Sequence, residues 1–117
     1  MPSPRDFLPL RPVDLHLLLV LAEGDAHGYG LVQSIAERTG GLVRLDPGNL
    51  YRVIKRLVDT GVIDEVERRR APDLGDERRR YYTLTALGRR VLTAEVERLQ
   101  ALVNAAATKA LVKRLAT

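Results

Sequence analysis

Cysteine and tryptophan are absent from the 117-residue sequence, and phenylalanine occurs once, at Phe7. Without cysteine there can be no disulfide, no thiol catalysis and no cysteine-ligated zinc. This composition fits a reducing compartment, and we expect a cytoplasmic protein. The scarcity of large aromatic residues also disfavours an aromatic-walled pocket for flat ligands, and leaves an aliphatic pocket at a dimer interface as an alternative.

Patterns typical of catalysis or metal binding are missing as well. Ser3 and Ser34 are the only serines, and neither has the context of a hydrolase nucleophile. His16 and His27 lie eleven residues apart without a second ligand type at metal spacing, so we expect no metal and no other cofactor. The acidic residues are not paired in an apolar setting that would shift a pKa. We therefore expect no catalytic residues and a protein that is not an enzyme.

Long hydrophobic stretches do not occur. The longest apolar run covers residues 17–22, whereas a helix that crosses a bilayer needs roughly 20 apolar residues. The first twelve residues carry four of the six prolines and lack the basic start, apolar stretch and cleavage site of a signal peptide. We therefore predict no membrane partner and an extended arm over residues 1–12.

Positive charge is present, and it is unevenly placed. The chain has a net charge of +4, divided into −2 over residues 1–43, +4 over residues 44–90 and +2 over residues 91–117. An anionic polymer such as nucleic acid would therefore meet the middle and the end of the chain. Eight acidic residues within the middle segment dilute this signal, so charge alone does not decide the function.

The first half of the chain has the pattern of three helices. Residues 13–23 are apolar nearly all round, which predicts a helix covered on several sides, in part by a second subunit. A second helix is expected to follow the turn before Tyr29, with that side chain packed on the core. Asp46 is a good N-cap for a third helix, which is expected to stop at Gly61.

The second half begins with a strand-like pattern. Two short runs that contain β-branched and aromatic residues flank a segment with proline, glycine and aspartate, which predicts a β-hairpin with a long, charged tip. Of the neighbouring Tyr81 and Tyr82, one is expected to pack inward with Leu84. Thr85 is then a suitable cap for a last helix that continues nearly to Thr117.

This order of elements predicts a mainly α fold with a small β-hairpin, the winged helix-turn-helix. We expect three regions: an N-terminal arm over residues 1–12, a winged helix-turn-helix DNA-binding domain over residues 13–84, and a C-terminal dimerisation helix over residues 85–117.

A winged helix places the start of its third helix against base edges in the major groove. In this chain the start and outer side of that helix carry short polar, aromatic and basic groups. We expect DNA contacts from Asn49, Tyr51, Arg52, Lys55 and Arg56. Arginines on both sides of the hairpin tip are placed to straddle phosphates or to enter the minor groove. These candidates are Arg68, Arg69, Arg70, Arg79 and Arg80.

The last helix is expected to hold the dimer together. Its apolar residues recur at alternating steps of four and three, which is the heptad seam of packed helices. An unbroken helix over residues 85–115 would be about 45 Å long, longer than so small a core. The alternative is a helix folded back on its own domain. The expected interface residues are Leu18 in the first helix and Leu92, Val96, Leu99, Val103, Ala106 and Ala110 in the last.

Three segments resemble the PadR family of winged-helix transcriptional regulators. They are HGYGLVQSI at residues 27–35, GNLYRVIKRLVDTGVI at residues 48–63 and RRYYTLTALGRRVL at residues 79–92. The family commonly has Thr or Ser where this chain has Asn49, and Pro where it has Arg52, so the resemblance does not carry over an operator sequence. It implies a dimeric, usually repressing DNA-binding protein that can respond to a small molecule.

The residues and the resemblance together predict a transcriptional repressor that binds double-stranded DNA at a palindromic operator as a homodimer, released by a small-molecule effector. The alternative is a winged helix used for protein–protein contact, in which the basic third helix and the arginine-rich hairpin would be incidental. The two hypotheses predict different effects of salt. Binding to DNA through neutralised phosphates weakens steeply as ionic strength rises, whereas apolar protein association weakens little.

Overall fold

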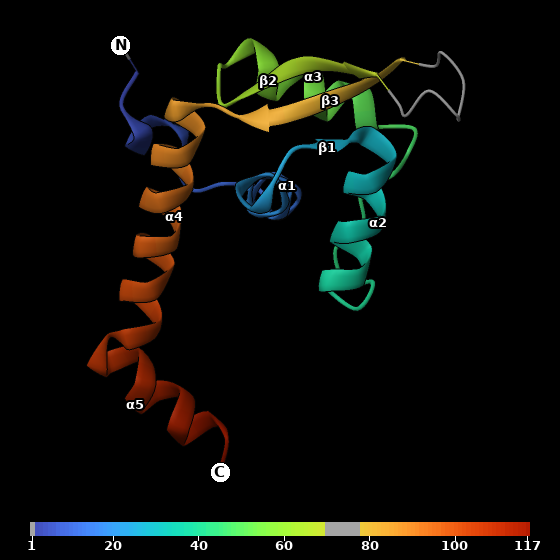
Figure 1. Cartoon of the computed structure of the whole chain (residues 1–117). Coiled ribbons are helices and arrows are strands. Elements are labelled where there is room, and N and C mark those ends of the chain that lie inside the picture. Colours follow the sequence, from blue (N-terminus) through green and yellow to red (C-terminus); the bar gives the residue numbers. More distant parts are fainter. Residues whose placement is uncertain (1, 70–77) are drawn as a thin grey trace.

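Five α-helices and a three-stranded antiparallel sheet make up the part of the chain that the computed structural model describes, residues 2–69 and 78–117 (Figure 1). The side chains of residues 67–69, 78 and 79 are not described. In chain order the elements are a 3₁₀ helix η1 (Pro4–Phe7), α1 (Pro12–Glu23), β1 (Ala26–His27), α2 (Gly28–Arg38), α3 (Leu50–Asp59), β2 (Ile63–Arg69), β3 (Arg78–Leu84), α4 (Ala86–Asn104) and α5 (Ala106–Leu115).

The predicted hairpin is confirmed, and a short third strand joins it. Strands β2 and β3 pair antiparallel from Ile63 opposite Leu84 outward. The two-residue strand β1 pairs with the other edge of β3, which gives the order β1-β3-β2. Tyr82 is buried in the core with Leu84, whereas Tyr81 is half-buried, as the alternation of side chains along a strand requires. The β2–β3 hairpin, called the wing below, therefore extends from a sheet whose third strand, β1, directly precedes α2.

The core is formed by the chain itself, around α1. Leu17 and Leu18 are fully buried, and residues of α2, α3, the sheet and α4 pack with them in one cluster. Leu15 and Leu19 on the same helix are only half-buried. The nearly all-round apolar pattern of this helix is therefore satisfied mostly within the chain, with one partly open side.

The third helix begins later than the sequence predicts. Its first helical residue is Leu50, its N-cap position is Asn49, and no side chain caps it. Asp46, predicted as the cap, instead forms a turn ahead of the helix, where its Oδ1 accepts a 3.0 Å hydrogen bond from the Gly48 amide. The cap prediction was wrong because a short Asx turn competes with helix capping for the same carboxylate.

An extended arm was predicted for the first twelve residues, but they are not extended throughout, because Pro4–Phe7 form η1. Residues of η1 and the segment after it pack on α4, with Phe7 and Leu8 partly buried against the core. Glu95 of α4 is 1% exposed, and its Oε2 accepts a 2.7 Å hydrogen bond from the Leu10 amide. Its carboxylate is also paired with Arg98. The arm is thus attached to α4 by a buried carboxylate that the sequence pattern did not reveal.

The hydrogen bond from Arg98, together with that from the Leu10 amide, lowers the pKa of Glu95 although burial opposes this. A carboxyl whose pKa is lower in the folded chain stabilises it above the unfolded-state pKa. That contribution is lost as the pH falls through the folded-state value. We therefore expect the attachment of the arm to weaken in acid.

The start of α4 is as predicted. Thr85 Oγ1 accepts a 3.0 Å hydrogen bond from the Gly88 amide, and it donates one of 2.6 Å to the carbonyl of Gly61. Gly88 lies so close to the strand that a Cβ there would be 2.0 Å from the Val62 carbonyl oxygen. Glycine at this position is what lets the helix approach the backbone at Val62, immediately before β2.

The predicted unbroken last helix is divided in two. The chain leaves helical geometry at Ala105, with φ −61° and ψ 132°, and α5 begins at the next residue. No proline or glycine follows Gly88, so the usual sequence signals for a break are missing. In Figure 1, the end of α4 and all of α5 extend away from the rest of the fold. The structure as a whole measures 58 × 36 × 23 Å.

Candidate nucleic-acid interface

Helix α3 is strongly two-sided. Leu50, Ile54 and Leu57 are buried in the core, so the opposite side of the helix faces outward. Tyr51 is 65% exposed, and the neighbouring Arg52 is exposed as well. Asn49, immediately before the helix, is also exposed. The first turn of α3 therefore offers an amide, a phenol and a guanidinium at the surface, which are groups able to bind base edges and phosphates.

The first turns of α2 and α3 lie against each other. A Cβ on Gly28 would be 3.0 Å from Leu50 Cδ2, so glycine allows this close approach. The next residue, Tyr29, is 64% exposed, and the prediction that it packs on the core was wrong. Tyr29 directly follows Gly28, and Tyr51 directly follows Leu50. Sequence reasoning missed Tyr29, although its place in the first turn of a helix was a usable signal.

Arg56 is partly exposed, and its side chain is bound to another helix. Its guanidinium makes two hydrogen bonds to the carboxylate of Asp14 on α1, of 2.9 Å and 2.8 Å. These hydrogen bonds raise the pKa of Arg56. Two of the five guanidinium N–H groups are thus bound to a carboxylate, and DNA contact by Arg56 stays a prediction. By contrast, Lys55 is exposed and pairs with Asp59 on its own helix, at 3.0 Å.

The wing brings basic residues together across its two strands. The pairing register places Arg68 opposite Arg79 and Arg69 opposite Arg78, which confirms at the level of the backbone that basic residues face each other across the hairpin. Arg80 is exposed, and its Nε lies 3.2 Å from a carboxylate oxygen of Glu65. An exposed pair of this kind contributes little to stability and leaves the guanidinium accessible. Arg70, also predicted to contact DNA, lies outside the described residues.

The residues predicted for the dimer interface separate into two groups. Leu18 and Leu92 are buried in the chain's own core, so their assignment to a surface between subunits is corrected. The heptad pattern could not distinguish cover by the same chain from cover by a partner. Val96, Leu99 and Val103 instead line a groove of about 280 Å³ on α4, and Leu15 and Leu19 of α1 form its other wall. Ala106 and Ala110, beyond the break, are exposed on α5.

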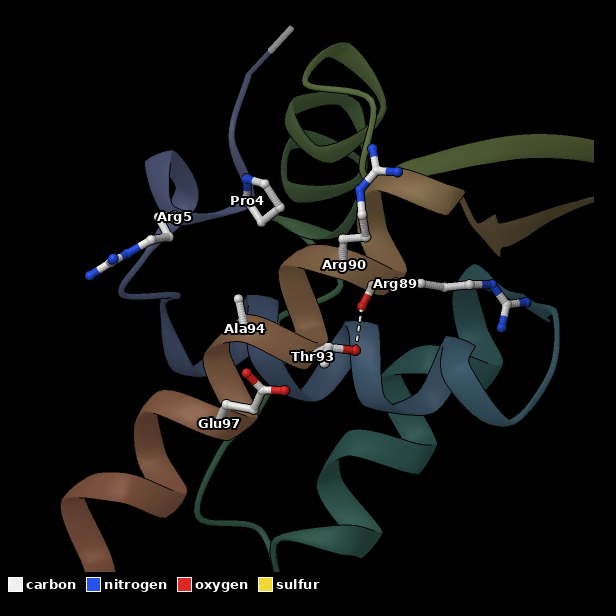
Figure 2. A pocket seen from close by; sticks show the side chains of 7 residues that line it. All are labelled: Pro4, Arg5, Arg89, Arg90, Thr93, Ala94 and Glu97. Carbon is white, nitrogen blue, oxygen red and sulfur yellow. Dashed lines mark hydrogen bonds between the residues drawn. The ribbon is translucent and has the colours of Figure 1, made fainter. Parts of the chain in front are cut away.

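A second hollow lies between the N-terminal arm and α4 (Figure 2). Its volume is about 460 Å³, and Pro4 and Ala94 contribute to its walls. The guanidinium groups of Arg5, Arg89 and Arg90 point in different directions in this view and do not converge on one point. The Thr93 hydroxyl donates a 2.8 Å hydrogen bond to the Arg89 carbonyl. This arrangement does not form a site for a single anion.

Two other kinds of site receive no support. Within residues 2–69 and 78–117, no group of three or more His, Cys, Asp or Glu side chains is placed to hold a metal ion. None of the helices in that part combines the length and the hydropathy needed to cross a membrane.

Comparisons with known proteins agree with this arrangement. A model of the transcriptional regulator PadR-like family matches residues 17–94. An uncharacterized protein from Lysinibacillus sphaericus is 31% identical over 86 residues, which are 73% of this chain and 75% of that protein. A transcriptional regulator from Clostridium thermocellum has a similar structure, with a TM-score of 0.66, 25% identity, and 97% of this chain and 93% of that chain covered.

The fold is also similar to that of Bacillus subtilis PadR, whose structure was determined in complex with operator DNA. The TM-score is 0.64 and the identity 23%, and the match covers 74% of this chain but 47% of that one. At this identity the likeness concerns the fold. It is the winged helix that the two chains share.

Proposed function

Because the chain belongs to the PadR-like family of transcriptional regulators, we propose that it binds a palindromic operator in duplex DNA as a homodimer. The observation that carries this proposal is the first turn of α3, where Tyr51 and Arg52 are exposed on a helix whose opposite side is buried. We assign base reading to Asn49 and Tyr51, and a phosphate contact to Arg52. The operator complex of Bacillus subtilis PadR, which has the same fold, supports DNA as the partner.

Phosphate contacts complete the interface in this proposal. Lys55 lies one turn further along the outer side of α3, and Tyr29 begins α2 close to the start of α3. The wing arginines Arg68, Arg69, Arg70, Arg79 and Arg80 supply charge that does not depend on sequence.

The second subunit is proposed to bind along α4 and α5. The groove lined by Leu15, Leu19, Val96, Leu99 and Val103 would receive apolar side chains of the partner. Repression is the expected outcome of operator binding. A small-molecule effector would act at this same interface, where the lining is mainly aliphatic, and would favour release of the DNA.

Removal of the exposed cations of α3 tests this proposal. We expect Arg52→Ala and Lys55→Ala each to weaken binding to a duplex selected from a random pool, and to reduce the salt slope by about one, because each change removes roughly one phosphate neutralisation. The measurement is an anisotropy titration at several salt concentrations. Lys109→Ala, on the exposed surface of α5, is the control and should change neither quantity.

The same titration separates the proposal from a winged helix used for protein contact. Apolar association should weaken little as salt is added, whereas DNA binding should fall steeply. If both α3 variants keep the affinity and slope of the wild-type chain, α3 does not lie at the DNA.

A further inference from the structure

The ion pair between Asp14 and Arg56 joins two helices that are far apart in the sequence. Asp14 lies in the first turn of α1, and Arg56 lies in the last turn of α3, 42 residues away. Each carboxylate oxygen accepts one hydrogen bond from a different guanidinium nitrogen, at 2.9 Å and 2.8 Å. This two-point geometry fixes the orientation of the guanidinium as well as its distance.

Burial makes this pair different from the others on α3. The Asp14 side chain is 6% exposed, whereas Asp59, which pairs with Lys55 on the same helix, is 62% exposed. A buried carboxylate needs a partner, because an unpaired charge away from water is strongly unfavourable. Arg56 is therefore held at Asp14, and the last turn of α3 is held with it.

A change in orientation at Arg56 would displace the exposed first turn of α3. The exposed residues Tyr51 and Arg52 lie in the first turn of a ten-residue helix, and Arg56 lies in its last. Tyr51 lies five residues before Arg56, about 7.5 Å along the helix axis, so a rotation of about 10° around Arg56 would move Tyr51 by roughly 1 Å. A displacement of that size exceeds the tolerance of hydrogen bonds to base edges.

We propose that Asp14 is a positioning residue for DNA binding, which holds α3 through Arg56 in the orientation that lets the first turn of α3 enter a groove. The inference rests on the proposed function and adds a residue of α1 to it. The next residue along α1, Leu15, lines the apolar groove on α4. Helix α1 thus contacts the proposed subunit interface and the reading helix through adjacent residues.

The substitution Asp14→Asn tests this role, because it removes the charge and keeps the volume. The probes are a duplex selected from a random pool by the wild-type chain and a scrambled duplex of equal length. We expect affinity for the selected duplex to fall about tenfold, as when the competent orientation is populated in about one tenth of the molecules. Affinity for the scrambled duplex and the salt slope should stay at the wild-type values, since no phosphate contact is lost.

Asp59→Asn is the matched control. It is the same chemical change in an ion pair with a basic residue of α3, at an exposed site. We expect its affinity for the selected duplex to remain within about twofold of the wild-type value. A large loss for this variant, equal to that of Asp14→Asn, would show that any carboxylate near α3 matters and would overturn the positioning role.

A double substitution keeps the test valid if a single variant does not fold. Arg56→Gln leaves the buried Asp14 carboxylate without its partner, whereas Asp14→Asn together with Arg56→Gln leaves two neutral amides that can bond to each other. We expect the double variant to bind the selected duplex about tenfold more tightly than Arg56→Gln, with the wild-type salt slope. A folded double variant with a smaller slope would show that Arg56 itself contacts phosphate, and the inference would fall.

Two further outcomes separate this inference from the function on which it rests. Tighter binding and a steeper salt slope for Asp14→Asn would mean that the freed Arg56 reaches the DNA, which contradicts positioning but agrees with DNA binding. A wild-type chain that selects no duplex would overturn the proposed function and this role together.

Discussion

Leu99→Asp is expected to convert the protein to a monomer and to reduce its affinity for operator DNA about 100-fold or more. Leu99 lines the groove between α4 and α1, beyond the core cluster of the chain. A carboxylate placed there would be buried without a partner in a dimer, at a cost of several kcal/mol. The monomer would hold one half-site only, and loss of the second site commonly costs a factor of about 10² to 10⁴. Sedimentation should give the single-chain mass of 13.0 kDa.

Ala101→Asp is the control for added charge on the same helix. Ala101 is exposed and does not line the groove, so this variant should keep the mass and DNA affinity of the wild-type chain. Because Leu99 is not part of the core cluster, the far-UV circular dichroism of Leu99→Asp should be unchanged. A folded Leu99→Asp dimer of wild-type mass would place the subunit contact elsewhere.

Gly88→Ala is expected to lower the free energy of unfolding by about 3 kcal/mol or more. The added methyl group would lie 2.0 Å from the Val62 carbonyl oxygen and 2.8 Å from Leu84 Cδ1, so α4 would have to move away from the sheet. Backbone atoms cannot relax as a flexible side chain can. Urea denaturation followed by circular dichroism, at equal protein concentrations, measures the loss.

Gly30→Ala is the matched comparison in another helix. A Cβ at this position of α2 would be 3.4 Å from the nearest atom of the His27 ring, which is ordinary contact. Alanine also favours a helix by about 1 kcal/mol over glycine, so we expect stability equal to or above that of the wild-type chain. Equal stabilities for Gly88→Ala and the wild-type chain would contradict the close approach of α4 to the backbone at Val62.

Local patterns in the sequence were sufficient for the order of elements. The apolar run over residues 13–23, the two-sided third helix and the strand-like runs on either side of the hairpin tip each span enough residues for a periodicity to be recognised. The prediction that Thr85 caps α4 needed only its hydroxyl oxygen, which accepts a hydrogen bond from an amide of the first turn. The two-residue strand β1 could not be predicted, because two residues have no period.

Long-range contacts account for what the sequence missed at the candidate site. Arg56 has the same sequence character as Arg52 and Lys55, and only the position of Asp14 on another helix distinguishes it. Likewise, Leu92 and Leu99 occupy the same heptad pattern, yet the first is buried in the core and the second lines an open groove. A periodic pattern identifies an apolar face, whereas the tertiary arrangement decides what covers it.

Selection of duplexes from a random pool by the purified wild-type chain is the most direct test of the central claim, that a dimer reads DNA with the first turn of α3. We expect enrichment of a palindrome whose half-site centres lie about one helical turn, roughly 34–36 Å, apart, because the two-fold symmetry of the protein maps onto its site. Enrichment of a single asymmetric half-site, or of no sequence at all, would contradict the account.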